Sequence, residues 1–176
     1  RIATILDKAE QTMQSSIRSL NSKSGLITST FIEMFGDSLT NPKNWKTKSL
    51  GALGLHISDG NYSAKYPKVD DFVEKGVPFL RANNLKKLSV NDDDMRYIST
   101  ELHRNVLLKG HVKVNDILIT TRGNIGQVGI VPKRHHGSNI NAQLVLLRTE
   151  GSEIHHHYLL SVLDSEGLQH QFRKLQ

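Results

Sequence analysis

The first 35 residues show a hydrophobic repeat of seven. Residues 2–35 contain no Pro and only one Gly. The apolar residues that recur at this interval are Leu6, Met13, Leu20, Ile27 and Met34. Such spacing predicts an amphipathic helix with a seam for a partner helix. Because mostly small or polar residues stand three positions after most seam residues, an ideal two-stranded coiled coil is not expected.

A continuous helix over residues 2–35 would be about 50 Å long, at about 1.5 Å per residue. That length exceeds what the core of a small domain can bury. We therefore expect residues 1–37 to form a coiled-coil-like arm whose seam needs a second helix, which the pattern does not identify. The alternative is an amphipathic helix folded back on its own domain. Gly36 followed by Pro42 predicts a helix end and a linker.

From Trp45 onward the pattern changes to short apolar runs separated by Gly, Asn and Pro, which is typical of strands and turns. The strongest predicted strands are 77–80, 116–121, 126–131 and 142–147. Residues 158–163 and 168–175 show helical spacing. The pattern predicts a mixed α/β chain: the arm, then a globular mixed-sheet domain over residues 38–176 that ends in helices.

Charge favours an anionic partner. The 176 residues have a net charge of +6, and clustered cations gain affinity for a polyanion by releasing its counterions. Between Ile117 and Thr149 there is no Asp or Glu, although Arg, Lys, Asn and Gln are frequent. Residues 81–87 have the same chemistry. Arg and Lys contact phosphates and guanine, and Asn and Gln can pair with adenine. These segments therefore predict a DNA-binding surface.

Individual roles follow from side-chain chemistry. The residues expected mainly at phosphates are Lys65, Lys86, Lys87, Lys133 and Arg134. The candidates for base contacts are Arg81, Asn83, Asn84, Arg122, Asn124 and Asn141. For Arg81, Asn141 and Gln143 the alternative is a structural role, in which the side chain satisfies backbone groups inside the fold.

Other chemistries are disfavoured. The chain has no Cys, which removes disulfides and cysteine-ligated zinc and fits a cytoplasmic protein. No metal site is expected at residues 135–136 or 155–157, since adjacent side chains point in different directions. Residues 92–94 are interpreted as solvated loop acidity rather than a magnesium site, and residues 123–129 as a tight strand-to-strand turn. No cofactor and no membrane segment are expected.

Several segments together resemble the target recognition domain of type I restriction-modification specificity subunits. Residues 31–37 resemble the end of that family's spacer helix, and 44–51 the entry to its recognition domain. Its two signatures resemble residues 57–60 with 76–85, and residues 115–126 with 139–143. The match extends over essentially the whole chain.

The resemblance implies a non-catalytic subunit that binds double-stranded DNA and docks methyltransferase (modification) subunits and, in the full complex, endonuclease (restriction) subunits. Family members carry two recognition domains held apart by two antiparallel helices. The partner of the arm would then be a second antiparallel helix from the same subunit or from a homodimer mate. The chain begins at Arg1 rather than Met, and we expect it to be part of a longer protein. The alternative function is helix-mediated assembly, with a basic domain that binds nothing specific.

Overall fold

The computed structural model describes residues 25–175 except 27, 63–65 and 87, and the chain divides into two compact units, residues 1–45 and 46–176. In the first unit residues 25–26 and 28–35 are helical. The seam residues Leu6, Met13, Leu20 and Ile27 lie outside the described residues, so the long arm stays a prediction. Met34 is described, and its side chain is exposed.

The end of this helix is closed by side chains that follow it. Gly36 has a φ of 81°, the left-handed conformation that commonly terminates helices. The last carbonyls of a helix lack backbone partners. Here the indole nitrogen of Trp45 donates to the Phe35 carbonyl at 3.0 Å, and the Lys43 ammonium donates to the Met34 carbonyl at 3.0 Å. The predicted helix end at Gly36 is confirmed.

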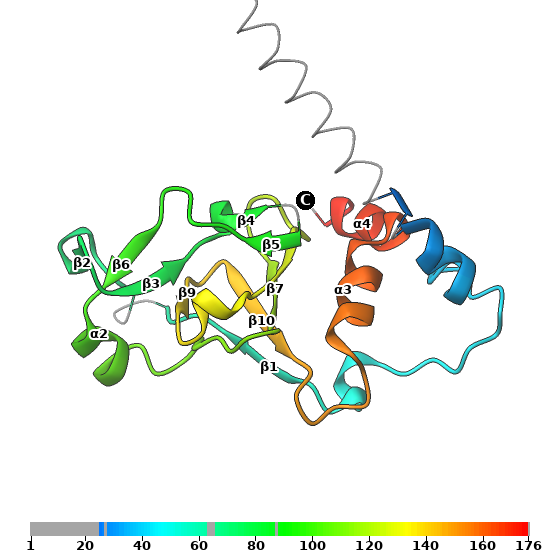
Figure 1. Ribbon diagram of the computed structural model, residues 1–176, viewed down its shortest axis with the longest axis horizontal. Coiled ribbons are helices and arrows are strands. Elements are labelled where there is room, and N and C mark those ends of the chain that lie inside the picture. The colour runs from blue at the N-terminus through cyan, green and yellow to red at the C-terminus, as the bar shows by residue number, and fades with distance from the viewer. Residues whose placement is uncertain (1–24, 27, 63–65, 87, 176) are drawn as a thin grey trace, which may run out of the picture. The chain divides into compact units, whose positions relative to one another are not determined.

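The second unit contains two mixed sheets (Figure 1). Among its described residues the six-stranded sheet has the order β1-β10-β7-β8-β5-β4. Its strands are β1 (His56–Asp59), β4 (Leu85–Lys86), β5 (Leu88–Val90), β7 (Ile117–Thr120), β8 (Val128–Ile130) and β10 (Leu144–Arg148). The four-stranded sheet has the order β2-β6-β3-β9. Its strands are β2 (Phe72–Val73), β3 (Val77–Leu80), β6 (Arg96–Ile98) and β9 (Asn139–Ile140).

Most strand pairs are antiparallel, and the pairs β5–β8 and β3–β9 are parallel. Each of the four predicted strands overlaps an observed one, β3, β7, β8 and β10. The α-helices of this unit are α2 (Thr100–Asn105), α3 (His156–Asp164) and α4 (Glu166–Arg173). The short 3-10 helices are η1 (Leu50–Leu53), η3 (Val69–Asp71), η4 (Ala82–Asn84) and η5 (Lys133–His135). The predicted mixed α/β class and the C-terminal helices are confirmed.

The central strands bury both faces. Along β10, Leu144 and Leu146 join one buried cluster with Leu118 of β7, while Leu147 joins a second cluster with Leu160 of α3. Because successive side chains of a strand point to opposite faces, an almost unbroken apolar run is expected when both faces are covered. The helices α3 and α4 cover one face of the larger sheet (Figure 1).

A buried ion pair joins β10 to the residue before β7. Arg148 donates from Nε and one terminal nitrogen to the two carboxylate oxygens of Asp116, at 2.8 and 2.7 Å. The backbone amide of Lys113 also donates to this carboxylate at 2.7 Å. The Asp116 side chain is 1% exposed. Hydrogen bonding to Asp116 raises the pKa of Arg148, so the guanidinium stays charged.

Candidate nucleic-acid interface

Three connecting segments leave the six-stranded sheet at the same end. β1 ends at Asp59 beside the start of β10, and Leu144 of β10 pairs with Thr120 at the end of β7. β8 begins at this end because it runs antiparallel to β7. We define the strand-end surface as five exposed residues that are on or beside these segments: Tyr62, Lys109, Arg122, Asn124 and Gln143.

The loop between β7 and β8 is held by Thr120. The backbone amide of Gly126 donates to the Thr120 carbonyl at 2.9 Å, and that of Gln127 donates to the Thr120 hydroxyl at 3.0 Å. The hydroxyl in turn donates to the carbonyl of Asn124. Gly126, with φ at 86°, packs against Phe172 of α4. The predicted tight turn is confirmed, and it holds the backbone at Arg122 and Asn124 while their side chains stay exposed.

Tyr62 lies between two cations. The Lys109 ammonium is 5.6 Å from the centre of its ring, and the Arg122 guanidinium carbon is 5.7 Å from it. These distances are within the range of cation–π attraction. Lys109 also pairs with Asp59 at 2.7 Å. Within the described residues Arg122 has no ion-pair partner, so its charge faces solvent.

The ionisation states in this cluster follow from its hydrogen bonds. The hydrogen bond from Lys109 holds the pKa of Asp59 below its ordinary value, outweighing the opposing effect of burial. The Tyr62 hydroxyl bonds to the same carboxylate, which raises the pKa of Tyr62. Tyr62 is therefore a neutral donor and Asp59 a carboxylate at neutral pH. Arg122 remains as the exposed positive charge.

Buried amides hold the backbone of Lys109. Asn61 and Asn139 are buried, and their side-chain nitrogens donate to the Lys109 carbonyl at 3.2 and 3.1 Å. Gly60 packs closely against the backbone of Asn141, because a Cβ added at Gly60 would lie only 2.5 Å from it. The signature segments around residues 60 and 140 thus form the scaffold beneath the strand-end surface.

Two residues predicted to contact bases are buried. Asn84 is fully buried, accepting from the Arg81 amide at 3.0 Å and donating to the Asp93 carbonyl at 2.8 Å. Asn141 is 3% exposed, and its side chain accepts from the Gln143 amide at 3.1 Å. Neither amide can reach a base in this conformation, so both predictions are wrong. For Asn141 the structural alternative is confirmed.

The acidic segment Asp92–Asp94 neutralises three of the predicted cations. Each carboxylate of this segment pairs with one of them, at 2.8 to 2.9 Å. The pairs are Arg134 with Asp92, Lys86 with Asp93, and Arg81 with Asp94. Asn83 also donates to Asp94 at 3.3 Å. Arg81 and Lys86 are thus neutralised by carboxylates 13 and 7 residues further along the chain, and Arg134 of the acid-free stretch by one 42 residues before it.

The predicted cations do not form one continuous face. Lys133 and Arg134 follow the far end of β8, whereas Arg122 and Asn124 precede its start. Lys133 is exposed and has no ion-pair partner within the described part of the chain. Lys65 and Lys87 lie outside the described residues. Of the predicted residues, Arg122 and Asn124 are thus brought together at the strand-end surface, and Arg81, Lys86 and Arg134 are tied to the acidic segment.

Tyr62 and Lys109 were missed by the sequence prediction. Tyr62 is a neighbour of both Lys109 and Arg122 in space, although 47 positions separate Tyr62 from Lys109 along the chain. Along the sequence, the only signal for Tyr62 is its position shortly after Gly60, which follows the apolar run of a strand. The only signal for Lys109 is its position after the apolar pair Leu107 and Leu108. No periodicity connects these two segments. Long-range strand pairing, which the pattern did not specify, brings them together.

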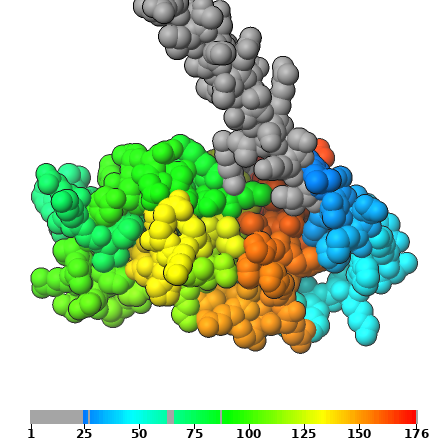
Figure 2. Space-filling model, in the orientation of Figure 1, coloured from blue at the N-terminus to red at the C-terminus, as the bar shows by residue number. Residues whose placement is uncertain are grey.

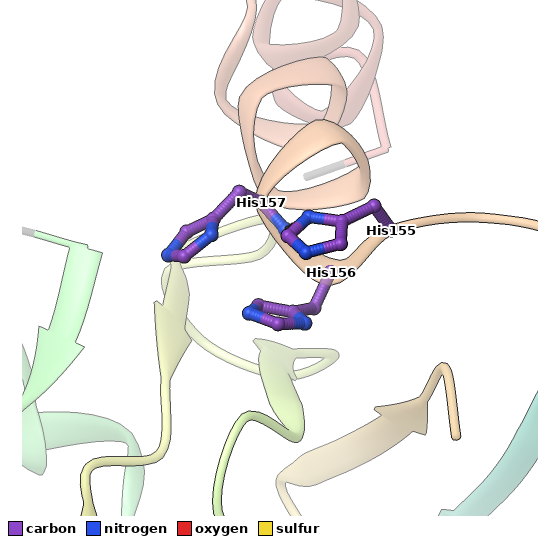
Figure 3. Close-up of side chains that lie close together, drawn as sticks. All are labelled: His155, His156 and His157. Carbon is purple, nitrogen blue, oxygen red and sulfur yellow. Dashed lines mark hydrogen bonds between the residues drawn. The ribbon is translucent and has the colours of Figure 1, made fainter.

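The histidine segment also departs from expectation. Side chains of the consecutive residues His155, His156 and His157 do not diverge, because one ring nitrogen of each lies within 4.8 Å of the others (Figure 3). His155 precedes α3 in an extended conformation, whereas the next two residues are helical. This change of backbone direction brings the rings together, so the geometric reason for excluding a metal site is wrong.

The two mixed sheets, with two helices packed on the larger one, form the fold of type I restriction-modification specificity subunits. The HsdS subunit from Thermoanaerobacter tengcongensis matches with a TM-score of 0.60 and 17% identity, over 97% of this chain and 40% of that chain. A chain from a structure on complex assembly and conformational transition of the type I R-M system matches with a TM-score of 0.56 and 16% identity, over 96% and 40%.

The chain spans about 40% of the length of these two solved proteins. The sequence matches no protein-family model and no curated protein. At 16–17% identity the likeness establishes the fold. Within the described residues no helix has both the length and the apolar character needed to cross a membrane.

Proposed function

We propose that this chain recognises a short sequence in double-stranded DNA, as part of the specificity subunit of a type I restriction-modification complex. The observation that supports this most is the strand-end surface on a specificity-subunit fold: Arg122 and Lys109 flank Tyr62, and two exposed amide side chains lie nearby. Its two cations have the chemistry to bind phosphates or guanine.

The strand-end surface also has groups that distinguish bases. Asn124 can form paired hydrogen bonds with adenine in the major groove. The Oε1 atom of Gln143 already accepts from Nδ2 of Asn141 at 3.1 Å, which leaves the Gln143 amide nitrogen to donate to a base. Arg122 can form the corresponding pair with guanine, which Lys109 cannot do with the same planar geometry. Because the Thr120 hydrogen bonds already order the β7–β8 loop, little entropy is lost when it binds. We assign base contacts to this loop and phosphate contacts to Lys109.

In this proposal the chain has no catalytic step and no cofactor, and it acts in the cytoplasm. Residues 38–176 form the recognition domain, and residues 1–37 the arm. The arm packs on a second antiparallel helix, from the same subunit or from a homodimer mate. Methyltransferase and endonuclease subunits carry out the chemistry at the site that this domain selects.

Selection from a random duplex pool tests the proposal. The chain is incubated with the pool, with and without its methyltransferase subunit, and bound duplexes are sequenced. We expect enrichment of one short half-site, and Arg122→Ala should lose the preference at one or two of its positions. Arg96→Ala, an exposed arginine on β6 of the other sheet, is the matched control and should keep the full preference. Absence of enrichment both with and without the methyltransferase subunit would favour the helix-mediated assembly function instead.

A further inference from the structure

The three histidines at the start of α3 form a compact group of nitrogen ligands. The ring centres of His155 and His156 are 4.2 Å apart, and those of His156 and His157 are 4.4 Å apart. One ring nitrogen from each residue lies within 4.8 Å of the other two. Figure 3 shows the three rings gathered at the start of the helix.

The three imidazoles have the chemistry and the spacing of metal ligands. A neutral imidazole offers a lone pair, and imidazole is a ligand that zinc, nickel and copper prefer. In a tetrahedral zinc site with Zn–N bonds of about 2.1 Å, ligand nitrogens lie about 3.4 Å apart. The ring nitrogens, which lie within 4.8 Å of one another, must therefore approach by up to about 1.4 Å, and the stacked His155 and His156 rings must turn, before all three bind one ion.

One existing hydrogen bond competes with this arrangement. The Nδ1 atom of His155 accepts from the backbone amide of His157, at the long distance of 3.3 Å. A metal bond through that nitrogen would replace the helix cap. The alternative is a metal bond through Nε2, for which the proton must move to Nδ1 and the same cap is lost. In both cases a weak bond is exchanged for a metal–nitrogen bond.

A cleft beside the histidines contains one further imidazole. His155 and His156 line a cleft of about 590 Å³, together with His136, Glu150 and Glu153. The segment around residue 136, yellow, and the start of α3, orange, adjoin on the face seen in Figure 2. Three histidines leave one position of a four-coordinate zinc ion open. His136 has the chemistry to fill it, whereas Glu150 and Glu153 are paired with Lys113 and Lys48.

We propose that His155, His156 and His157 form a zinc-binding site at the start of α3. The site is separate from the strand-end surface, because its cleft includes residues at the end of β10 and before β7, whereas the strand-end surface adjoins the opposite ends of these strands. Bound zinc would fix the first turn of α3. That helix packs through Leu159, Leu160 and Leu163 on the six-stranded sheet, so zinc should stabilise this unit.

The test uses the full chain without an affinity tag, after removal of metal with a chelator. Isothermal titration with Zn²⁺ should show one site in the micromolar range, and Mg²⁺ in large excess should not compete. We expect His156→Gln and His157→Gln each to weaken binding at least tenfold. His170→Gln, an exposed histidine on α4, is the matched control and should leave the affinity unchanged.

Thermal unfolding provides the second measurement. Zinc should raise the melting temperature of the unmodified chain and of the His170→Gln variant, because a ligand that binds the folded state stabilises it. It should raise that of the His157→Gln variant much less. The proposal is overturned if millimolar zinc gives no binding heat, if Mg²⁺ competes equally, or if both Gln variants at positions 156 and 157 bind zinc as the unmodified chain does.

Discussion

The ion pair between Asp116 and Arg148 gives the sharpest prediction for stability. The change is Asp116→Asn, which removes the negative charge but nearly preserves the volume. Asp116 is 1% exposed and Arg148 is 16% exposed, so the remaining guanidinium would have neither a counterion nor full access to water. Breaking a buried pair in this way costs about 3–5 kcal/mol. For a unit of this size that corresponds to a melting temperature lower by about 10–20 °C.

Urea denaturation followed by circular dichroism measures this loss. The exposed pair between Lys113 and Glu150 is the matched control, and Glu150→Gln should cause no measurable change, because solvent screens it. Exchanging both partners, Asp116→Leu with Arg148→Met, should recover only part of the stability, because no unpaired charge remains but the Lys113 amide and the His111 carbonyl lose their partners. The reasoning is refuted if Asp116→Asn costs less than about 1 kcal/mol, the value typical of a solvated pair.

Three further predictions concern the acidic segment, a buried histidine and a packed glycine. Changing Asp92, Asp93 and Asp94 together to Asn frees three cations, so non-specific duplex binding should strengthen. The slope of log affinity against log salt should become steeper by up to about 0.9 per freed cation. An unchanged slope, measured by fluorescence anisotropy, would contradict this. Burial lowers the pKa of His135 despite the nearby Asp92, so the unfolded chain takes up a proton more readily and the free energy of unfolding should fall as the pH drops below about 6.5. His135→Gln should reduce that loss, measured by urea titrations between about pH 7.5 and 5. An equal loss in both proteins would argue against this role of His135. Gly60→Ala should destabilise the folded protein by about 1–3 kcal/mol, because the new Cβ would lie 2.5 Å from backbone atoms. Gly51→Ala is the control, because open space surrounds Gly51, and it should cause no such loss. Similar melting temperatures for the two variants would disprove the packing argument.

The central strands could be predicted because their apolar runs are unusually clear. Residues of β7 and β10 alternate between two buried clusters, so both faces are apolar and the runs stand out from the turns around them. The helix α2 was missed. Its six residues span less than two turns and include only Leu102 as an apolar side chain, which is too short for helical spacing to appear.

The candidate site was predicted less well, because electrostatic partners come from distant segments. Nothing in the segment after Ile117 indicates that Arg134 pairs with Asp92, or that Arg148 pairs with Asp116. An amide is equally suited to a base and to a buried backbone group, so composition could not separate exposed Asn124 from buried Asn141. Exposure, which depends on the tertiary fold, decides between the two roles.

The salt dependence of duplex binding tests the central claim most directly. The protein carries Lys109→Ala together with Arg122→Ala, and the probe is a duplex with the enriched half-site. Because Lys109 is assigned to a phosphate and Arg122 to a base, the affinity should fall and the slope of log affinity against log salt should become less steep by about 0.9, the effect of one lost phosphate contact. Lys75→Ala, between β2 and β3 of the other sheet, should leave both affinity and slope nearly unchanged. A folded double variant with the slope and affinity of the unmodified chain would contradict DNA binding by the strand-end surface.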